Sequence, residues 1–162
     1  MRNVIALLIA GLSPVLVAAA ENKTVTLSRS GYSIDVLDPG LAEAGVFESF
    51  KMLLPPKEGF ASNVNVQHQK FAGTLSDYKM TSEANLKEIK LTVSNARLEN
   101  GAYTAEAVGK VRGLEFELHF YFKAIKSGDN VILATAAIPS SRWDTEKELL
   151  LPIINSLVPT KK

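Results

Sequence analysis

The segment from Leu114 to Lys123 constrains the fold most, because it alternates strictly between two kinds of side chain. One set is apolar: Leu114, Phe116, Leu118, Phe120 and Phe122. The other set is charged, polar or amphipathic: Glu115, Glu117, His119, Tyr121 and Lys123. A period of two places these sets on opposite faces of a β-strand. We expect the phenylalanine face to pack under a helix and the face with His119 and Tyr121 to stay at least partly open.

This segment belongs to a series of four strands expected in the second half of the chain. They span roughly residues 90–98, 102–111, 114–125 and 130–138. The short breaks between them carry the Gly, Asn and Asp residues that tight turns require, so the series predicts an antiparallel meander. Val131 to Ile138 is apolar on both faces, which is typical of a central strand covered on both sides.

Four shorter strands are expected earlier in the chain, over roughly residues 23–28, 32–36, 46–54 and 63–69. In the last of these, Val64, Val66 and His68 share one face. The opposite face carries only amides, Asn63, Asn65, Gln67 and Gln69, and we expect it to lie in water.

Two helices complete the pattern. Thr74 is expected to cap the first, with Asp77 as its capping-box partner, and this helix should end near Ile89. The segment 141–144 also resembles a capping box, and an apolar stripe follows it. Pro152 lies within that stripe and predicts a kink or a restart of the second helix. The sequence therefore predicts an α+β domain, an antiparallel β-sheet meander flanked by helices.

The first twenty residues indicate export. Val4 to Val17 is almost entirely apolar, and Ala18-Ala19-Ala20 offers small residues for cleavage before Glu21. This is the layout of a secretory signal peptide, and the apolar run, interrupted by Pro14, is short for a membrane span. We expect residues 1–20 to be removed after Ala20 and residues 21–162 to form a single periplasmic domain.

Composition excludes several classes of function. Without Arg2, the chain keeps 17 Lys+Arg against 17 Asp+Glu, so its formal charge gives no basis for binding nucleic acid. The sequence contains no cysteine. Disulfides, thiolate metal sites and a lipid anchor on cysteine are therefore excluded.

Three stretches resemble a known family. They are Leu53 to Phe60 followed by Asn63 to Val66, then Leu118 to Phe122, then Ala134-Thr135-Ala136 leading to Trp143. Together they resemble the bacterial DcrB-like proteins, a branch of the PsbP-like superfamily. The resemblance implies a PsbP-like α/β/α sandwich and a role as an accessory or binding protein. It brings no catalytic signature, and DcrB itself carries a lipid anchor for which this chain lacks the cysteine.

Catalytic and metal-binding chemistry has few candidates. His68 and His119 would form half of a metal site if their strands were adjacent, but H-x-H and H-E-x-x-H are both missing. G-x-S-x-G is missing as well, and no glycine-rich loop precedes a helix. We expect no cofactor and no metal. The alternative is a small periplasmic hydrolase or metal-dependent enzyme that uses His68 or His119.

The favoured hypothesis is that the chain is an exported, non-enzymatic accessory or binding protein that recognises a protein partner in the bacterial cell envelope. The polar strand face and its neighbourhood supply the candidate partner surface. Phe60 lies in a loop bounded by prolines and is either a small plug of the core or an exposed contact. The candidate partner surface comprises Glu117, His119, Tyr121, Asn63, Asn65 and Phe60.

Overall fold

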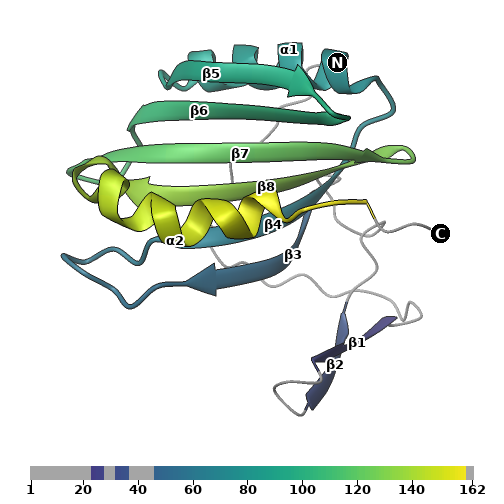
Figure 1. Cartoon of the computed structure of the whole chain (residues 1–162), viewed down its shortest axis with the longest axis horizontal. Coiled ribbons are helices and arrows are strands. Elements are labelled where there is room, and N and C mark those ends of the chain that lie inside the picture. Colours follow the sequence, from purple (N-terminus) through teal and green to yellow (C-terminus); the bar gives the residue numbers. More distant parts are fainter. Residues whose placement is uncertain (1–22, 28–31, 37–45, 160–162) are drawn as a thin grey trace.

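The computed structural model describes residues 23–27, 32–36 and 46–159, and the leader predicted over residues 1–20 lies outside them. The main body is a six-stranded antiparallel sheet with one helix on each face, and two short strands form a separate sheet (Figure 1). The elements are β1 (Lys23–Leu27), β2 (Tyr32–Val36), β3 (Val46–Leu53), β4 (Asn63–Lys70), α1 (Leu75–Glu88), β5 (Thr92–Glu99), β6 (Ala102–Lys110), β7 (Glu117–Ser127), β8 (Asn130–Pro139), a 3₁₀ turn (Ser140–Arg142) and α2 (Trp143–Asn155). This arrangement confirms the predicted α+β class.

The large sheet has the strand order β3-β4-β8-β7-β6-β5. Strands β5 to β8 pair consecutively, which confirms the predicted meander. Strand β4 then pairs with the far side of β8 and β3 pairs with β4. Strand β8 is therefore central, and its residues from Val131 to Pro139 are buried except at Ile132, as its apolar composition on both faces predicts.

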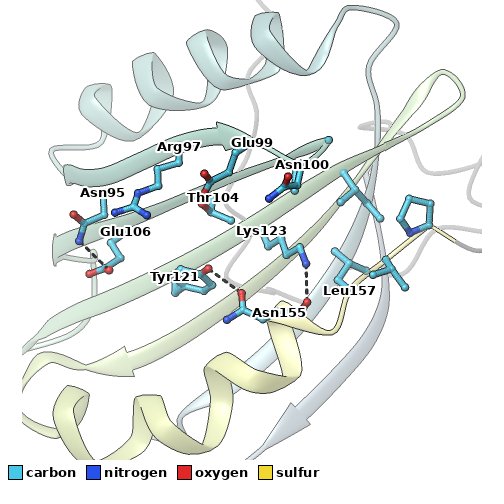
Figure 2. A pocket seen from close by; sticks show the side chains of 15 residues that line it. Asn95, Arg97, Glu99, Asn100, Thr104, Glu106, Tyr121, Lys123, Asn155 and Leu157 are labelled. Carbon is cyan, nitrogen blue, oxygen red and sulfur yellow. Dashed lines mark hydrogen bonds between the residues drawn. The ribbon is translucent and has the colours of Figure 1, made fainter.

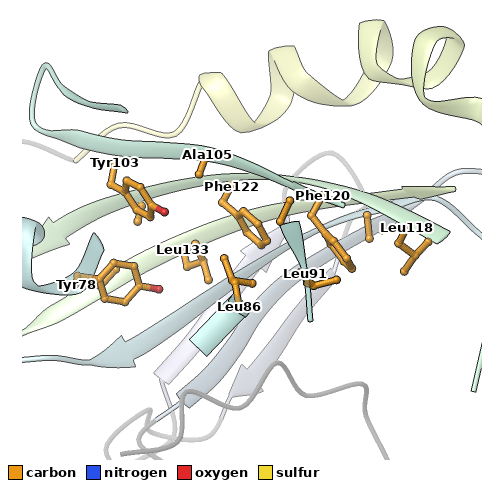
Figure 3. Packing of buried hydrophobic residues seen from close by; sticks show 13 residues of the cluster. Tyr78, Leu86, Leu91, Tyr103, Ala105, Leu118, Phe120, Phe122 and Leu133 are labelled. Carbon is orange, nitrogen blue, oxygen red and sulfur yellow. The ribbon is translucent and has the colours of Figure 1, made fainter. Parts of the chain in front are cut away.

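The two helices cover opposite faces of this sheet and build two separate cores. Helix α1 covers the phenylalanine face, where Phe120 and Phe122 pack with Tyr78 and Leu86 of the helix (Figure 3). Helix α2 covers part of the other face, where Leu150 and other apolar side chains of the helix pack on β4 and β8. The expected helix above the phenylalanine face is thus confirmed.

The amide face of β4 is half-buried at Asn63 and Asn65 and buried at Gln67 and Gln69, whereas its polarity predicted that it lies in water. Gln67 and Gln69 are only 8 % and 5 % exposed. They lie on the α1 side of the sheet, and the amide of Gln69 donates to Gln67. The Tyr78 hydroxyl on α1 donates to the Gln69 side-chain oxygen at 2.7 Å. Burial is tolerated because these amides find hydrogen-bond partners within the core.

The two helix starts differ. Thr74 and Asp77 form the predicted capping box of α1, with each side chain accepting a hydrogen bond from the other residue's backbone amide. The second predicted box is wrong, because Ser140–Arg142 forms a 3₁₀ turn and the N-cap of α2 is Arg142, without a side-chain cap. Helix α2 also continues through Pro152 to Asn155 rather than restarting. Pro152 has no N–H to donate to the Glu148 carbonyl, so the helix continues with one hydrogen bond fewer at this point.

Candidate functional site

Helix α2 leaves half of its sheet face uncovered. It packs chiefly on β8, β7 and β4, and strands β5 and β6 on the same face have no helix above them. A groove of about 590 Å³ lies there, between the three strands β5, β6 and β7 and the end of α2 with the segment that follows it (Figure 2). Volumes of this order are typical of ligand-binding sites.

Strand register arranges the floor of the groove in three rows across β5, β6 and β7. The first row holds Glu106 and Tyr121, which the side chain of Asn95 joins from a bulge in β5. The second row holds Arg97, Thr104 and Lys123, and the third holds Glu99, Ala102 and Ile125. Neighbouring strands lie about 4.8 Å apart, so the members of each row are side by side. The groove is thus polar at the first row, cationic at the second and partly apolar at the third, beside Leu157 and Val158.

A bulge in β5 positions one end of the first row. The register of β5 with β6 shifts between Ser94 and Arg97, and Asn95 takes a left-handed backbone conformation with φ 51°. Asparagine adopts this conformation more readily than most residues. The Asn95 amide then donates to Glu106 Oε1 at 3.1 Å. The bulge therefore turns an edge-strand side chain toward the floor of the groove.

The wall formed by α2 is fastened to β7 at the final residue of the helix. The Tyr121 hydroxyl donates to Asn155 Oδ1 at 2.9 Å, and Lys123 Nζ donates to the Asn155 carbonyl oxygen at 2.6 Å. A cation at a helix C-terminus also complements the helix dipole. Burial, and secondarily the Glu106 carboxylate, raises the pKa of Tyr121. The phenol is therefore protonated at neutral pH and available as a donor.

A Glu-His-Trp cluster closes the first row. His119 Nε2 lies 2.8 Å from Glu106 Oε2, and its ring stacks on Trp143 with 3.5 Å between ring centroids and 6° between planes. Among the described residues, the contacts of His119 include no serine or threonine hydroxyl. Glu106 and Trp143 fix the orientation of the His119 ring, but the nucleophile that acyl transfer would require is missing from these contacts.

Two charged side chains of the groove are available to bind a ligand. Arg97 and Glu99 project from the same face of β5 and both are exposed. Neither makes a hydrogen bond or an ion pair with any residue in the described part of the chain. An unpaired guanidinium beside the Thr104 hydroxyl offers donors to an incoming anionic group.

The structure does not bring the six predicted surface residues together. Tyr121 lines the groove, His119 lies beneath Trp143, and Glu117 is exposed at the start of β7. Asn63 and Asn65 pair with Ala137 and Thr135 of β8, on the opposite face of the sheet from Tyr121.

Phe60, the remaining member of the predicted surface, is a partly buried plug of the core on the α1 side. Its ring packs edge-on against Phe116, with 5.6 Å between centroids. Period two fixes which side chains of one strand share a face, but it does not relate the faces of two distant strands. The predicted surface therefore divides between both faces of the sheet.

The groove contains residues that sequence reasoning missed, Arg97, Thr104 and Asn155. A signal for Thr104 was present, because β6 alternates between buried Tyr103, Ala105 and Ala107 and half-buried Thr104 and Glu106. Arg97 carried a weaker signal, because β5 is polar on both faces and a bulge interrupts its alternation. Asn155 lines the groove because the C-terminal end of α2 packs beside β7 in the folded protein. No local sequence pattern predicts that packing.

The two histidines do not approach one another. They lie on β4 and β7, which β8 separates, and their register partners on β8 are Ile132 and Ile138. Ile132 and Ile138 are six residues apart on β8, which separates the two histidines by about 20 Å along the strand direction. This distance is too long for both to bind one metal ion. Among the described residues, no group of three or more His, Asp or Glu side chains is placed to hold a metal.

Within the part of the chain that the structure describes, no helix combines the length and apolarity needed to cross a membrane.

Comparison with known proteins adds information on the fold. No family model matches the chain, and no curated protein matches it. Among solved structures, the chain is similar to PA94, a protein of unknown function from Pseudomonas aeruginosa. The TM-score is 0.61 at 12 % identity, and the match covers 88 % of this chain and 100 % of that one.

The chain is also similar to CyanoP, the cyanobacterial PsbP of Synechocystis sp. PCC 6803. That match has a TM-score of 0.39 at 16 % identity and covers 91 % of this chain and 96 % of that one. The DcrB-like assignment stays a prediction. The likeness to PA94, at 12 % identity, shows a shared fold and leaves function to be argued from the groove.

Proposed function

We propose that this protein is an exported, non-enzymatic binding protein that acts in the bacterial cell envelope by recognising a protein partner through the groove on β5, β6 and β7. One observation carries the proposal. Half of a sheet face lacks a covering helix and forms a groove of about 590 Å³, with an unpaired Arg97 on its floor. Exposed charge and an aromatic side chain beside a fixed wall are common features of recognition sites.

The arrangement of the groove supports binding over catalysis. Its wall is fastened through Asn155, and its Glu106 carboxylate is already held by Asn95 and His119. In the described lining, the hydroxyl groups belong to Thr104 and Tyr121, and neither forms a hydrogen bond with His119. A rigid, hydrogen-bonded wall reduces the entropy that is lost when a partner binds. The leader pattern of residues 1–20 supports the envelope as the place of action.

Site-specific photo-crosslinking in living cells tests the proposal. A photoreactive amino acid replaces Thr104 on the groove floor, and a matched control carries it at Lys87, exposed on α1 at the opposite face of the sheet. We expect a discrete envelope protein to crosslink at Thr104 and not at Lys87, and the product to disappear when Arg97→Glu is added. Equal crosslinking at both positions, or a product indifferent to Arg97→Glu, would contradict recognition through this groove.

A further inference from the structure

The second and third rows of the groove differ sharply in chemistry. The second row presents two cations on either side of a hydroxyl, Arg97, Thr104 and Lys123. The third row ends in Ile125, and Leu157 and Val158 extend this apolar end. Figure 2 shows Leu157 at the end of the groove away from Asn95 and Glu106. A ligand complementary to both rows carries an anionic group and an apolar group close together.

We propose that the groove binds an extended segment of the partner protein in which an acidic side chain and an apolar side chain are two residues apart. This inference rests on the proposed function and names what the groove recognises. The acidic side chain binds the row of Arg97, Thr104 and Lys123, and the apolar side chain packs against Ile125 and Leu157.

Spacing supports an extended segment. The second and third rows are two residues apart on every strand, from Arg97 to Glu99 and from Lys123 to Ile125. Two residues of strand span about 6.6 Å, and residues i and i+2 of an extended peptide point to the same side at the same separation. A segment lying along the strands therefore places both side chains on their rows at once. Side chains of consecutive residues would point in opposite directions.

Charge supports the acidic group. Arg97 has no ion-pair partner among the described residues, and the Lys123 ammonium uses one of its three donors on Asn155. The Glu106 carboxylate is occupied by Asn95 and His119. Two carboxylates of the groove oppose an anion. Glu99 lies exposed beside Arg97 on the same face, and Glu106 lies one row away with its oxygens bound by Asn95 and His119.

The amides of the groove favour a peptide over a hydrocarbon chain. Asn95, Asn100 and Asn155 all line the groove. Side-chain amides donate and accept hydrogen bonds, which a peptide main chain can satisfy and an alkyl chain cannot. A purely apolar ligand would also leave these groups without water, at a cost in free energy.

Fluorescence anisotropy with synthetic peptides tests the inference. The probe is the amidated, fluorescein-labelled pentapeptide SSDSL. One control, SSNSL, replaces the acid by its amide, and another, SSDLS, keeps the composition but makes the acidic and apolar residues consecutive. We expect the purified protein to bind SSDSL about tenfold or more tightly than either control. SSNSL loses the charge-assisted contact, and SSDLS cannot place its apolar side chain on the third row while its acid is on the second. Equal binding of SSDSL and SSNSL, or of SSDSL and SSDLS, overturns the inference.

Three exposed positions supply variants that should leave the fold unchanged, which thermal unfolding verifies. Arg97→Gln should weaken SSDSL binding about tenfold or more, and Glu99→Gln should tighten it by removing like-charge repulsion. Arg112→Gln, in the turn before β7 and outside the groove, is the matched control and should change nothing. Loss of binding in Arg112→Gln equal to that in Arg97→Gln would indicate unspecific attraction and overturn the inference.

The peptide result is distinguishable from the crosslinking result. If Thr104 crosslinks an envelope protein in an Arg97-dependent way while SSDSL fails to bind, the groove is a recognition site and the acidic–apolar spacing is wrong. If crosslinking at Thr104 also fails, the proposed function fails with it.

Discussion

Replacing Phe120 with alanine should destabilise the protein much more than replacing its sequence neighbour Tyr121. Phe120 is 4 % exposed and belongs to the core between the sheet and α1, where its ring lies 5.9 Å from that of Phe122 (Figure 3). The alanine variant would lack this ring, which would leave a cavity in the hydrophobic core. Large-to-small changes of a buried phenylalanine cost about 3–5 kcal/mol in the free energy of unfolding.

Tyr121 faces the groove on the other side of the same strand and is only partly buried. Replacing Tyr121 with alanine removes less buried apolar surface than replacing Phe120. The expected loss in the free energy of unfolding is about 1 kcal/mol for a partly exposed site. The lost hydrogen bond to Asn155 adds roughly 0.5–1.5 kcal/mol. The Tyr121→Phe variant, which loses only the hydroxyl, should show the second contribution by itself.

Urea denaturation followed by circular dichroism measures all three variants against the parent protein. The slope of the transition should stay constant, so that shifts of the midpoint report stability. If Tyr121→Ala is as damaging as Phe120→Ala, the groove side of β7 is a second full core and cannot serve as an open recognition surface. If Phe120→Ala costs less than about 1 kcal/mol, the core beneath α1 is not packed as described.

Further predictions concern a helix cap, export and metal binding. Thr74→Ala removes the capping box of α1 and should cost about 1 kcal/mol in urea denaturation. Hydrogen bonds from the Thr74 side chain and backbone lower the pKa of Asp77, so this carboxylate stabilises the fold above its unfolded pKa of about 4. The stability difference between the parent and Asp77→Asn should therefore vanish as pH falls through the lowered pKa, and a difference that grows in acid would contradict this reasoning. N-terminal sequencing of protein from the envelope fraction should begin at Glu21, and an intact initiator methionine on cytoplasmic protein would refute export. Elemental analysis should give the same metal content for the parent and for His68→Ala/His119→Ala, whereas stoichiometric zinc or manganese lost in the variant would favour a metalloenzyme.

Local sequence pattern was sufficient for most of the fold. The strict alternation of Leu118 to Lys123 fixed the two faces of β7, and the apolar run of β8 identified the central strand. The capping box at Thr74 also followed from local spacing. Each of these features depends on residues that are neighbours in the chain, where geometry is set by the backbone period.

Tertiary relations between distant segments were not predictable in the same way. Period two gave the amides of β4 one common face, but the pairing of β4 with β8 decided that this face lies under α1. Tyr78 then supplies the hydrogen bond that makes burial of Gln69 tolerable. The prediction of a capping box at the start of α2 failed for another reason. A 3₁₀ turn stands where the spacing from Ser141 to Asp144 suggested a side-chain cap.

The central position of β8 has a consequence for how the protein unfolds. Consecutive residues of this strand belong to different cores, with Leu133 and Ala137 on the α1 side and Ala134 and Ala136 on the α2 side. The two helices, on opposite sides of the sheet, are thus coupled through one shared strand. Opening either core disturbs the backbone that supports the other, which favours a single cooperative transition. Amide protons of β8 should accordingly exchange with solvent only through global unfolding, more slowly than those of the exposed edge strand β5.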